Sequence, residues 1–200
     1  FDAESVRIEK EKVFGSIVLP DDLDLHTACG QYGPGWQGGV KVKGYLEEDG
    51  IPPDSKTDTF AAIKLNVETR RWAGVPFYLR TGKRLPSRFA EIVIQFRDIP
   101  HAASRDWGGV VQPNRFIIRL QPEDQLAIRM MVKDHTGGED ALKEVELNLD
   151  VTSTAEGAVR LGPYLRLMLA AAAGDQSLFV HRDEVDEAWR WVDQIIEGWQ

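Results

Sequence analysis

The middle of the chain alternates apolar and polar residues, and this period of two constrains the fold more than any other feature of the sequence. In residues 91–97, Ile92, Ile94 and Phe96 share one face, while polar and charged residues mark the other. Similar patterns occupy residues 59–68, 115–121, 126–133 and 144–151. Such alternation is typical of β-strands covered on one face, and the short turns between successive strands favour an antiparallel sheet.

The two ends of the chain show helical spacing instead. Residues 2–17 form a predicted amphipathic helix, and Pro163 and Gly174 suit the first position and the C-terminal cap of another. The last helix is predicted behind an N-cap at Asp183, with an apolar stripe at Val185, Ala188, Trp189, Val192, Ile195, Ile196 and Trp199. Strands followed by helices predict an α+β fold, in which one domain over 1–200 has a large, mostly antiparallel sheet with helices packed on one face.

Charge and hydropathy exclude several classes of protein. The formal net charge of −8 argues against a nucleic-acid partner, because phosphate neutralisation needs a broad basic surface. No segment approaches the roughly 20 apolar residues that cross a bilayer, so no membrane association is expected. The single cysteine, Cys29, leaves no internal disulfide, and we expect a small buried side chain in a cytoplasmic protein.

Other patterns look functional but lack the required context. Residues 33–38, GPGWQG, match the dinucleotide pattern G-x-G-x-x-G, yet an extended pattern follows them where a helix would be needed. The carboxylates and the histidine of 21–26 match no standard ligand spacing, and His101, His135 and His181 have no cysteine, histidine or carboxylate nearby at metal-ligand spacing. We therefore predict no metal site and no dinucleotide-binding fold within this chain.

Residues 80–88, RTGKRLPSR, gather Arg80, Lys83, Arg84 and Arg88 without an acidic residue. They fall between two strand patterns, beside a glycine and a proline, where the chain must turn. Guanidinium and ammonium groups can together hold a phosphate and its adjacent hydroxyls. The alternative is a solvated basic turn that keeps the sheet edge from pairing with other chains, and spacing alone favours this second interpretation.

A longer run around this turn resembles a known family. Residues 70–96, RRWAGVPFYLRTGKRLPSRFAEIVIQF, are similar to the C-terminal domain of glucose-6-phosphate dehydrogenase, in which R-W-x-G-V-P-F-x-L-R-T-G-K-x-L is a characteristic run. Residues 30–65, 117–122 and 174–193 resemble the loop and first strand, a later strand and the helical end of that domain. The resemblance extends over nearly the whole chain.

The resemblance implies a substrate and roles for three residues. Lys83 matches the family lysine that contacts the sugar of glucose 6-phosphate, Arg88 the basic residue that meets its phosphate, and Gln121 a further sugar contact. An amide can donate to and accept from hydroxyls, while the two cations suit a dianion. The entire enzyme would oxidise glucose 6-phosphate to 6-phosphogluconolactone with NADP or NAD, as the first step of the pentose phosphate pathway.

The resemblance also implies what this chain lacks. The family's dinucleotide-binding fold, which holds most of the NADP or NAD, and its histidine base precede the matched domain. No catalytic residue is therefore expected in this chain, which alone should be inactive. Arg80, Arg119 and Arg129 match positions that some members use for a second, structural NADP. Gly162 stands where relatives often have an aspartate, which argues against that second site.

The exposed face of the predicted sheet should form the interface of a homodimer or tetramer, as the resemblance implies. Two other classes of function stay open. A non-catalytic relative could keep the domain as a dimerisation module, with Lys83 and Arg88 serving only solubility. A sugar-phosphate-binding regulator would keep the pocket without turnover. A cofactor loop and a base histidine in the preceding part of the protein would favour the enzyme.

Overall fold

The computed structural model describes residues 2–98, 111–134, 142–150 and 161–199. The chain forms two compact units, one made of Phe1–Pro86 and Leu161–Gln200 and the other of Ser87–Arg160. Each unit has a sheet of its own. None of the helices in the described part of the chain combines the length and the apolar character that a membrane span requires.

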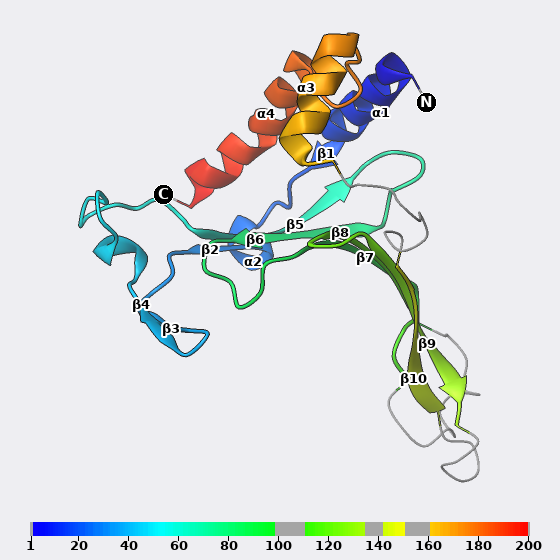
Figure 1. Ribbon diagram of the computed structural model, residues 1–200, viewed down its shortest axis with the longest axis horizontal. Coiled ribbons are helices and arrows are strands. Elements are labelled where there is room, and N and C mark those ends of the chain that lie inside the picture. Colours follow the sequence, from blue (N-terminus) through cyan, green and yellow to red (C-terminus); the bar gives the residue numbers. More distant parts are fainter. Residues whose placement is uncertain (1, 99–110, 135–141, 151–160, 200) are drawn as a thin grey trace. The chain divides into compact units, whose positions relative to one another are not determined.

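The first unit contains a four-stranded antiparallel sheet made of β1 (Ile17–Val18), β2 (Thr27–Gly30), β5 (Phe60–Val67) and β6 (Pro76–Gly82) (Figure 1). Ala61 of β5 pairs with Thr81 of β6 and with Cys29 of β2, so β5 is the central strand. β1 pairs with the end of β5, where Ile17 lies opposite Val67. The alternating segment 59–68 is therefore the strand on which this unit is built.

The glycine-rich segment 33–38 belongs to a hairpin of the first unit. β3 (Gly35–Gln37) pairs antiparallel with β4 (Val40–Val42), and Gly38 and Gly39 form the turn with φ values of 57° and 80°. Glycine adopts such left-handed angles without the steric cost of a Cβ. A strand, β4, follows these glycines, as the sequence predicts. Two short helical elements flank the hairpin: α2 (Leu23–His26) and the 3-10 helix η1 (Tyr45–Glu47).

The longer helices of the first unit are α1 (Ala3–Gly15), α3 (Pro163–Ala173) and α4 (Arg182–Gly198). Pro163 begins α3 and Gly174 caps it with a φ of 70°, as the sequence predicts. The predicted N-cap of α4 is wrong by two residues. His181 is the cap, because its Nδ1 accepts a hydrogen bond of 3.4 Å from the N–H of Asp183. Asp183 lies in the first turn, where the helix dipole favours a carboxylate.

The core of the first unit lies where α4 packs on β5, with α1 alongside α4 (Figure 1). Its buried members are Leu65 and Val67 of β5 with Trp191 and Ile195 of α4. The predicted stripe of α4 is therefore shifted, since Trp191 is 8% exposed whereas Trp189 is 54% exposed. Trp189 and Trp191 both lie three or four residues from other apolar residues of α4, so helical spacing alone does not show which of the two is buried. Packing against β5 buries Trp191.

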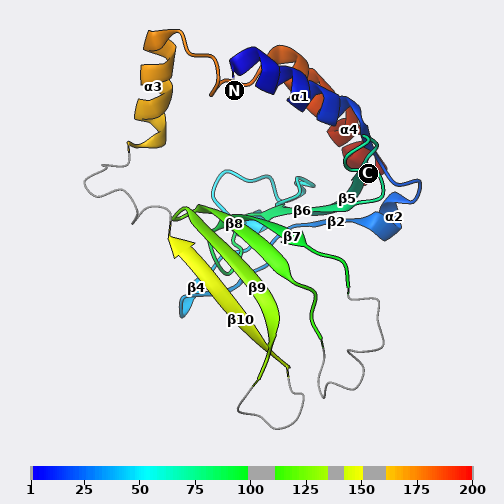
Figure 2. The same ribbon diagram turned by 90° about the vertical axis from the view of Figure 1, so that its right-hand side faces the viewer.

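The second unit is an antiparallel meander of β7 (Ala90–Gln95), β8 (Arg115–Gln121), β9 (Gln125–Lys133) and β10 (Leu142–Asp150), in that spatial order (Figure 2). Paired residues share a face of the sheet, and on one face Ile92 pairs with Ile118 and Ile94 with Phe116. Ile92 and Ile94 are 50% and 42% exposed, so this apolar face is only partly covered. The predicted strands are confirmed, but the predicted covering of their apolar face is wrong, because the buried residues Ile117 and Ala127 lie on the opposite face.

The α+β class and the antiparallel pairing are also confirmed. The structure differs from the prediction in the extent of the sheet, because the described strands form two four-stranded sheets and the β3–β4 hairpin. The strand pattern is interrupted between Gly82, where β6 ends, and Ala90, where β7 begins. Arg84 has a φ of 55° in this interval, and Pro86 has no N–H to donate, so neither suits a continuous ladder.

Candidate functional site

Lys83 directly follows β6, and its backbone is fixed while its side chain is exposed. Its N–H donates to the carbonyl oxygen of Thr59 at 2.8 Å. A Cβ on the preceding Gly82 would lie 3.0 Å from Cδ2 of Phe60 and 3.3 Å from that same oxygen, so glycine allows the close approach of the two strands. Within the described part of the chain, the ammonium group of Lys83 makes no hydrogen bond or ion pair. It is therefore available to a ligand.

Arg84, the next cation, already has partners in the first unit. Its Nη2 donates to Oε1 of Glu48 at 2.5 Å, and its Cζ lies 5.7 Å from the ring centroid of Tyr32. The hydrogen bond that Arg84 donates to Glu48 holds the pKa of Arg84 above its ordinary value. The basic turn is therefore not a uniform cluster, since a carboxylate neutralises Arg84 while Lys83 has no such partner among the described residues.

Arg88 and Gln121 belong to the second unit. Arg88 precedes β7 by two residues, and Ala90, the first residue of β7, pairs with Gln121 at the end of β8. The fold thus brings two of the three predicted substrate residues to the same end of the β7–β8 pair. Both side chains are exposed. Neither makes a hydrogen bond or an ion pair with residues of the described segments.

The boundary between the two units falls between Pro86 and Ser87, so Lys83 lies in the first unit and Arg88 in the second. Lys83 directly follows β6 of the first sheet, and Arg88 precedes β7 of the meander by two residues. That Lys83, Arg88 and Gln121 act on a common ligand stays a prediction.

The three arginines predicted for a second dinucleotide differ in their surroundings. Arg80 lies in β6 and is exposed. Arg119 donates to Glu91 at 3.2 Å and to Gln125 at 3.4 Å. Arg129 pairs with Glu146, and this hydrogen bond raises the pKa of Arg129 and lowers that of Glu146.

A phosphate would have to displace a carboxylate at both Arg119 and Arg129, which lie on neighbouring strands of the second unit. Arg80 belongs to the first unit. The arginines as they stand therefore do not fit a preformed site for a second NADP, because two of the three are neutralised by the protein itself. The structural dinucleotide stays an untested expectation.

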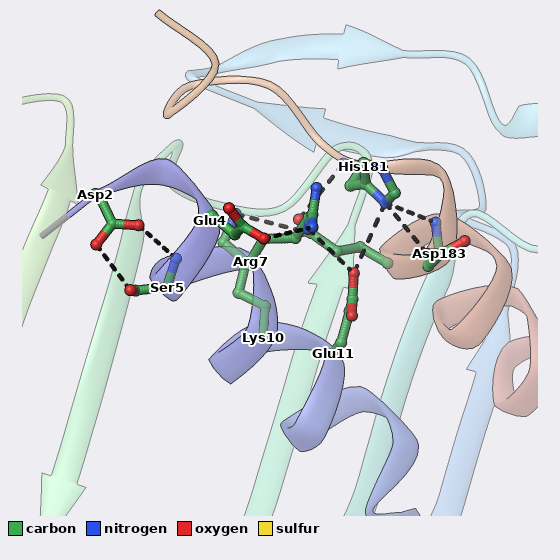
Figure 3. A network of polar contacts seen from close by, with 9 residues as sticks. Asp2, Glu4, Ser5, Arg7, Lys10, Glu11, His181 and Asp183 are labelled. Atoms are coloured by element: carbon green, nitrogen blue, oxygen red, sulfur yellow. Dashed lines mark hydrogen bonds and ion pairs between the residues drawn. The ribbon is translucent and has the colours of Figure 1, made fainter.

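A charged network between α1 and α4 is the feature that sequence reasoning missed (Figure 3). Nδ1 of His181 lies 3.7 Å from Oε1 of Glu11 and 3.5 Å from Oδ2 of Asp183. Nε of Arg7 lies 3.6 Å from the same Oε1 of Glu11. Sequence spacing could not place Glu11 beside His181, because Glu11 comes from the other end of the chain.

Glu11, His181 and Asp183 offer ligand atoms that all lie within 4.8 Å of one another, as a metal site would require. Two observations argue against a cation there. The guanidinium of Arg7 already compensates Glu11, and His181 caps the N-terminus of α4, where the helix dipole repels positive charge. We interpret this network as a structural connection between α1 and α4.

Cys29 is exposed in β2, which contradicts the expected burial. Its strand lies at an edge of the first sheet, where it pairs with β5. Partial desolvation and the nearby carboxylate of Asp58 raise the pKa of the thiol above its ordinary value. A thiol with a raised pKa is a poor nucleophile at neutral pH, so Cys29 is not a candidate catalytic residue.

The family model described as "Glucose-6-phosphate dehydrogenase, C-terminal domain" matches residues 1–200. The chain belongs to this family. A glucose-6-phosphate 1-dehydrogenase from Zymomonas mobilis is 47% identical and covers 100% of the chain, and one from Rhizobium meliloti is 44% identical with the same coverage. The matched parts are 41% and 40% of those two relatives, so this glucose-6-phosphate dehydrogenase domain spans about two fifths of their length.

Solved structures agree with this assignment. A glucose-6-phosphate dehydrogenase in complex with its substrate glucose 6-phosphate superposes with a TM-score of 0.81 at 33% identity, over 98% of this chain and 39% of that one. The glucose-6-phosphate 1-dehydrogenase of Mycobacterium avium gives a TM-score of 0.79 at 29% identity, over 98% of this chain and 38% of that one. The α+β fold derived above is thus the fold of the family's C-terminal domain.

Proposed function

We propose that this domain forms part of the sugar-phosphate site of an enzyme that oxidises glucose 6-phosphate to 6-phosphogluconolactone with NADP or NAD. One observation supports the proposal most directly. The ammonium of Lys83 is exposed on a fixed backbone, and among the described residues no carboxylate neutralises it. The relative whose structure is titled as a substrate complex covers 98% of this chain, which supports the same substrate here.

The chemistry of the three predicted residues suits a sugar phosphate. Lys83 would donate to a sugar hydroxyl, and Arg88 would present its planar group to the phosphate oxygens. Gln121 can both donate to and accept from hydroxyl groups. Arg88 and Gln121 lie at the same end of the β7–β8 pair, which supports their acting together.

The role of the domain in the reaction is to bind and orient the sugar. Hydride transfer requires the cofactor, a base and the sugar in one geometry, and we propose that the cofactor binds mainly to the part of the protein that precedes this domain. NADP or NAD would supply the hydride acceptor there. No catalytic residue is assigned to this chain, so we propose that the domain alone binds substrate without turnover. The single cysteine supports the cytoplasm as the proposed compartment.

We also propose that a second copy of the domain covers the apolar face of the β7–β10 sheet, giving a homodimer or a pair of such dimers. Ile92, Ile94 and Leu147 on this face are 50%, 42% and 60% exposed. Contiguous apolar surface of this kind is typical of protein interfaces. An isologous contact would bury the face against its own copy.

The substrate site is tested by Lys83→Ala and Arg88→Ala in the full-length enzyme, with Lys56→Ala, another exposed lysine of the first unit, as the matched control. Removing a hydrogen bond to a charged group should cost about 1.5–3 kcal/mol, which raises KM for glucose 6-phosphate by roughly tenfold or more. KM for the cofactor should change little, and the control should leave both values unchanged. Unaltered substrate kinetics in Lys83→Ala and Arg88→Ala would refute the proposed site.

Turnover and glucose 6-phosphate binding, measured on the full-length protein and on Lys83→Ala, separate the alternative functions. A dimerisation module would show no turnover and no binding of glucose 6-phosphate by the full-length protein. A regulator would bind the sugar phosphate, with weaker binding in Lys83→Ala, but would not reduce NADP or NAD. Reduction of either cofactor in the presence of glucose 6-phosphate supports the enzyme.

A further inference from the structure

Arg84 adopts a backbone conformation that an arginine rarely has. Its φ of 55° is left-handed, and it is the only non-glycine residue with a positive φ in the described part of the chain. A β-carbon makes this region unfavourable, so surrounding contacts must hold the residue there. Arg84 directly follows Lys83, and its conformation therefore fixes the direction in which the chain leaves the proposed sugar-binding residue.

The contacts that hold Arg84 come from a segment far away in the sequence. Oε1 of Glu48 accepts a hydrogen bond from Nη2 of Arg84 at 2.5 Å and another from the hydroxyl of Tyr32 at 3.3 Å. The guanidinium also lies against the Tyr32 ring, with 5.7 Å between its Cζ and the ring centroid. The charge of Arg84 is thus satisfied by a carboxylate and an aromatic face of the same unit.

These contacts close a ring that includes Lys83. The N–H of Tyr32 donates to Oγ1 of Thr59 at 2.9 Å, and the carbonyl of Thr59 accepts from the N–H of Lys83 at 2.8 Å. Thr59 therefore holds Lys83 from one side, while Glu48 and Tyr32 hold Arg84 from the other. Lys83 is the member of the ring whose side chain makes no polar contact within the described residues.

We propose that Arg84 is a positioning residue: its contact with Glu48 and Tyr32 holds the Lys83 ammonium in the orientation that binds the sugar. The inference rests on the proposed function of Lys83 and deepens it. Arg84 itself does not touch the substrate, because its guanidinium is committed to Glu48. Glu48 and Tyr32 become part of the binding site through this contact, although the sequence places them more than thirty residues before Lys83.

The test uses Arg84→Asn and Glu48→Gln in the full-length enzyme. Asparagine tolerates a left-handed conformation, so Arg84→Asn removes the contact with Glu48 without adding backbone strain. KM for glucose 6-phosphate should rise about threefold to tenfold, since loosened orientation weakens but does not remove the charged contact of Lys83. The turnover number and KM for the cofactor should stay unchanged. Arg84→Lys keeps a cation that can reach Glu48, so its KM for glucose 6-phosphate should lie between those of the unchanged enzyme and Arg84→Asn.

Glu48→Gln decides whether Arg84 positions Lys83 or binds the substrate directly. If Arg84 positions, loss of the carboxylate charge weakens its contact, because an amide oxygen is a weaker acceptor for a guanidinium, and KM for glucose 6-phosphate rises in the same direction as in Arg84→Asn. If Arg84 binds the phosphate itself, loss of its competing carboxylate lowers KM or leaves it unchanged. Either of these last two results would overturn the inference.

A double-mutant cycle gives the second readout. In a Lys83→Ala background, Arg84→Asn should raise KM for glucose 6-phosphate no further, because the residue through which it acts is gone. An equal rise in both backgrounds would show that Arg84 acts independently and would overturn the inference. An effect of Lys83→Ala with none of Arg84→Asn removes the inference but leaves the proposed function intact. No effect of Lys83→Ala removes both. Thermal unfolding shows whether each variant is folded. If Arg84→Asn is not folded, KM is compared in Arg84→Lys and Glu48→Gln instead.

Discussion

Ile195 of α4 is a deeply buried side chain whose truncation should strongly destabilise the first unit. It is 1% exposed and belongs to the core cluster with Leu65, Val67 and Trp191. Ile195→Ala removes three carbon groups, a loss of about 2.4 kcal/mol in transfer free energy at roughly 0.8 kcal/mol each. The cavity left between α4 and β5 adds to this, so we expect a total of about 3–4 kcal/mol, within the range of about 2–5 kcal/mol for such changes.

Ile196→Ala is the matched control, because it makes the same chemical change one residue further along the same helix. Ile196 is 39% exposed, so its truncation removes less buried surface and leaves no closed cavity. Its cost should stay below about 1.5 kcal/mol. Both variants gain the same helix propensity from alanine, and the difference between them therefore reports burial alone.

The assay is hydrogen exchange of the α4 amides in the full-length protein, which measures the opening of this helix without assuming that all parts unfold together. The opening free energy should fall by about 2 kcal/mol more in Ile195→Ala than in Ile196→Ala, because Ile195 is fully buried and Ile196 is partly exposed. Equal losses, or a larger loss in Ile196→Ala, would refute the packing of α4 on β5 described above.

Two further predictions concern the N-cap of α1 and the interface. The hydrogen bond from the Ser5 N–H lowers the pKa of Asp2 in the folded protein below its ordinary value of 3.8. The stability that ionised Asp2 adds to α1 is therefore fully present at pH values above 3.8, and it is lost as the pH falls through the lower pKa of the folded state. Asp2→Asn, which keeps a capping oxygen, should remove this acid dependence from the α1 exchange rates, and an unchanged pH profile would contradict the cap. Ile94→Lys should shift the full-length protein to a smaller oligomer in light scattering, whereas Gln95→Lys on the opposite face should not, and an unchanged mass for Ile94→Lys would exclude this face as the interface.

Local sequence signals predicted the elements whose boundaries depend on local chemistry. Pro163 and Gly174 bound α3 because a proline suits the first helical position and a glycine the left-handed cap. The alternating segments became β5 and β7–β10, because the period of two is a property of the strand itself. The choice of Trp189 for the buried stripe was wrong because helical spacing permits two neighbouring stripes, and contact with β5 selects Trp191.

The candidate site was less accessible from the sequence. The resemblance supplied Lys83, Arg88 and Gln121, whereas the run of cations alone favoured a solvated turn. Spacing could not distinguish Arg84 from Lys83, because the difference is made by Glu48, which lies 36 residues away from Arg84. Contacts of this kind depend on how the turn after β6 meets the η1 segment, and no local pattern encodes them.

The most direct test of the proposed function is a crystal structure of the full-length protein with glucose 6-phosphate bound. The ammonium of Lys83 should lie within hydrogen-bond distance of a sugar hydroxyl, and the guanidinium of Arg88 should contact the phosphate of the same molecule. Arg84 should still donate to Glu48 in that complex. A bound sugar phosphate that touches neither Lys83 nor Arg88 would contradict the assignment.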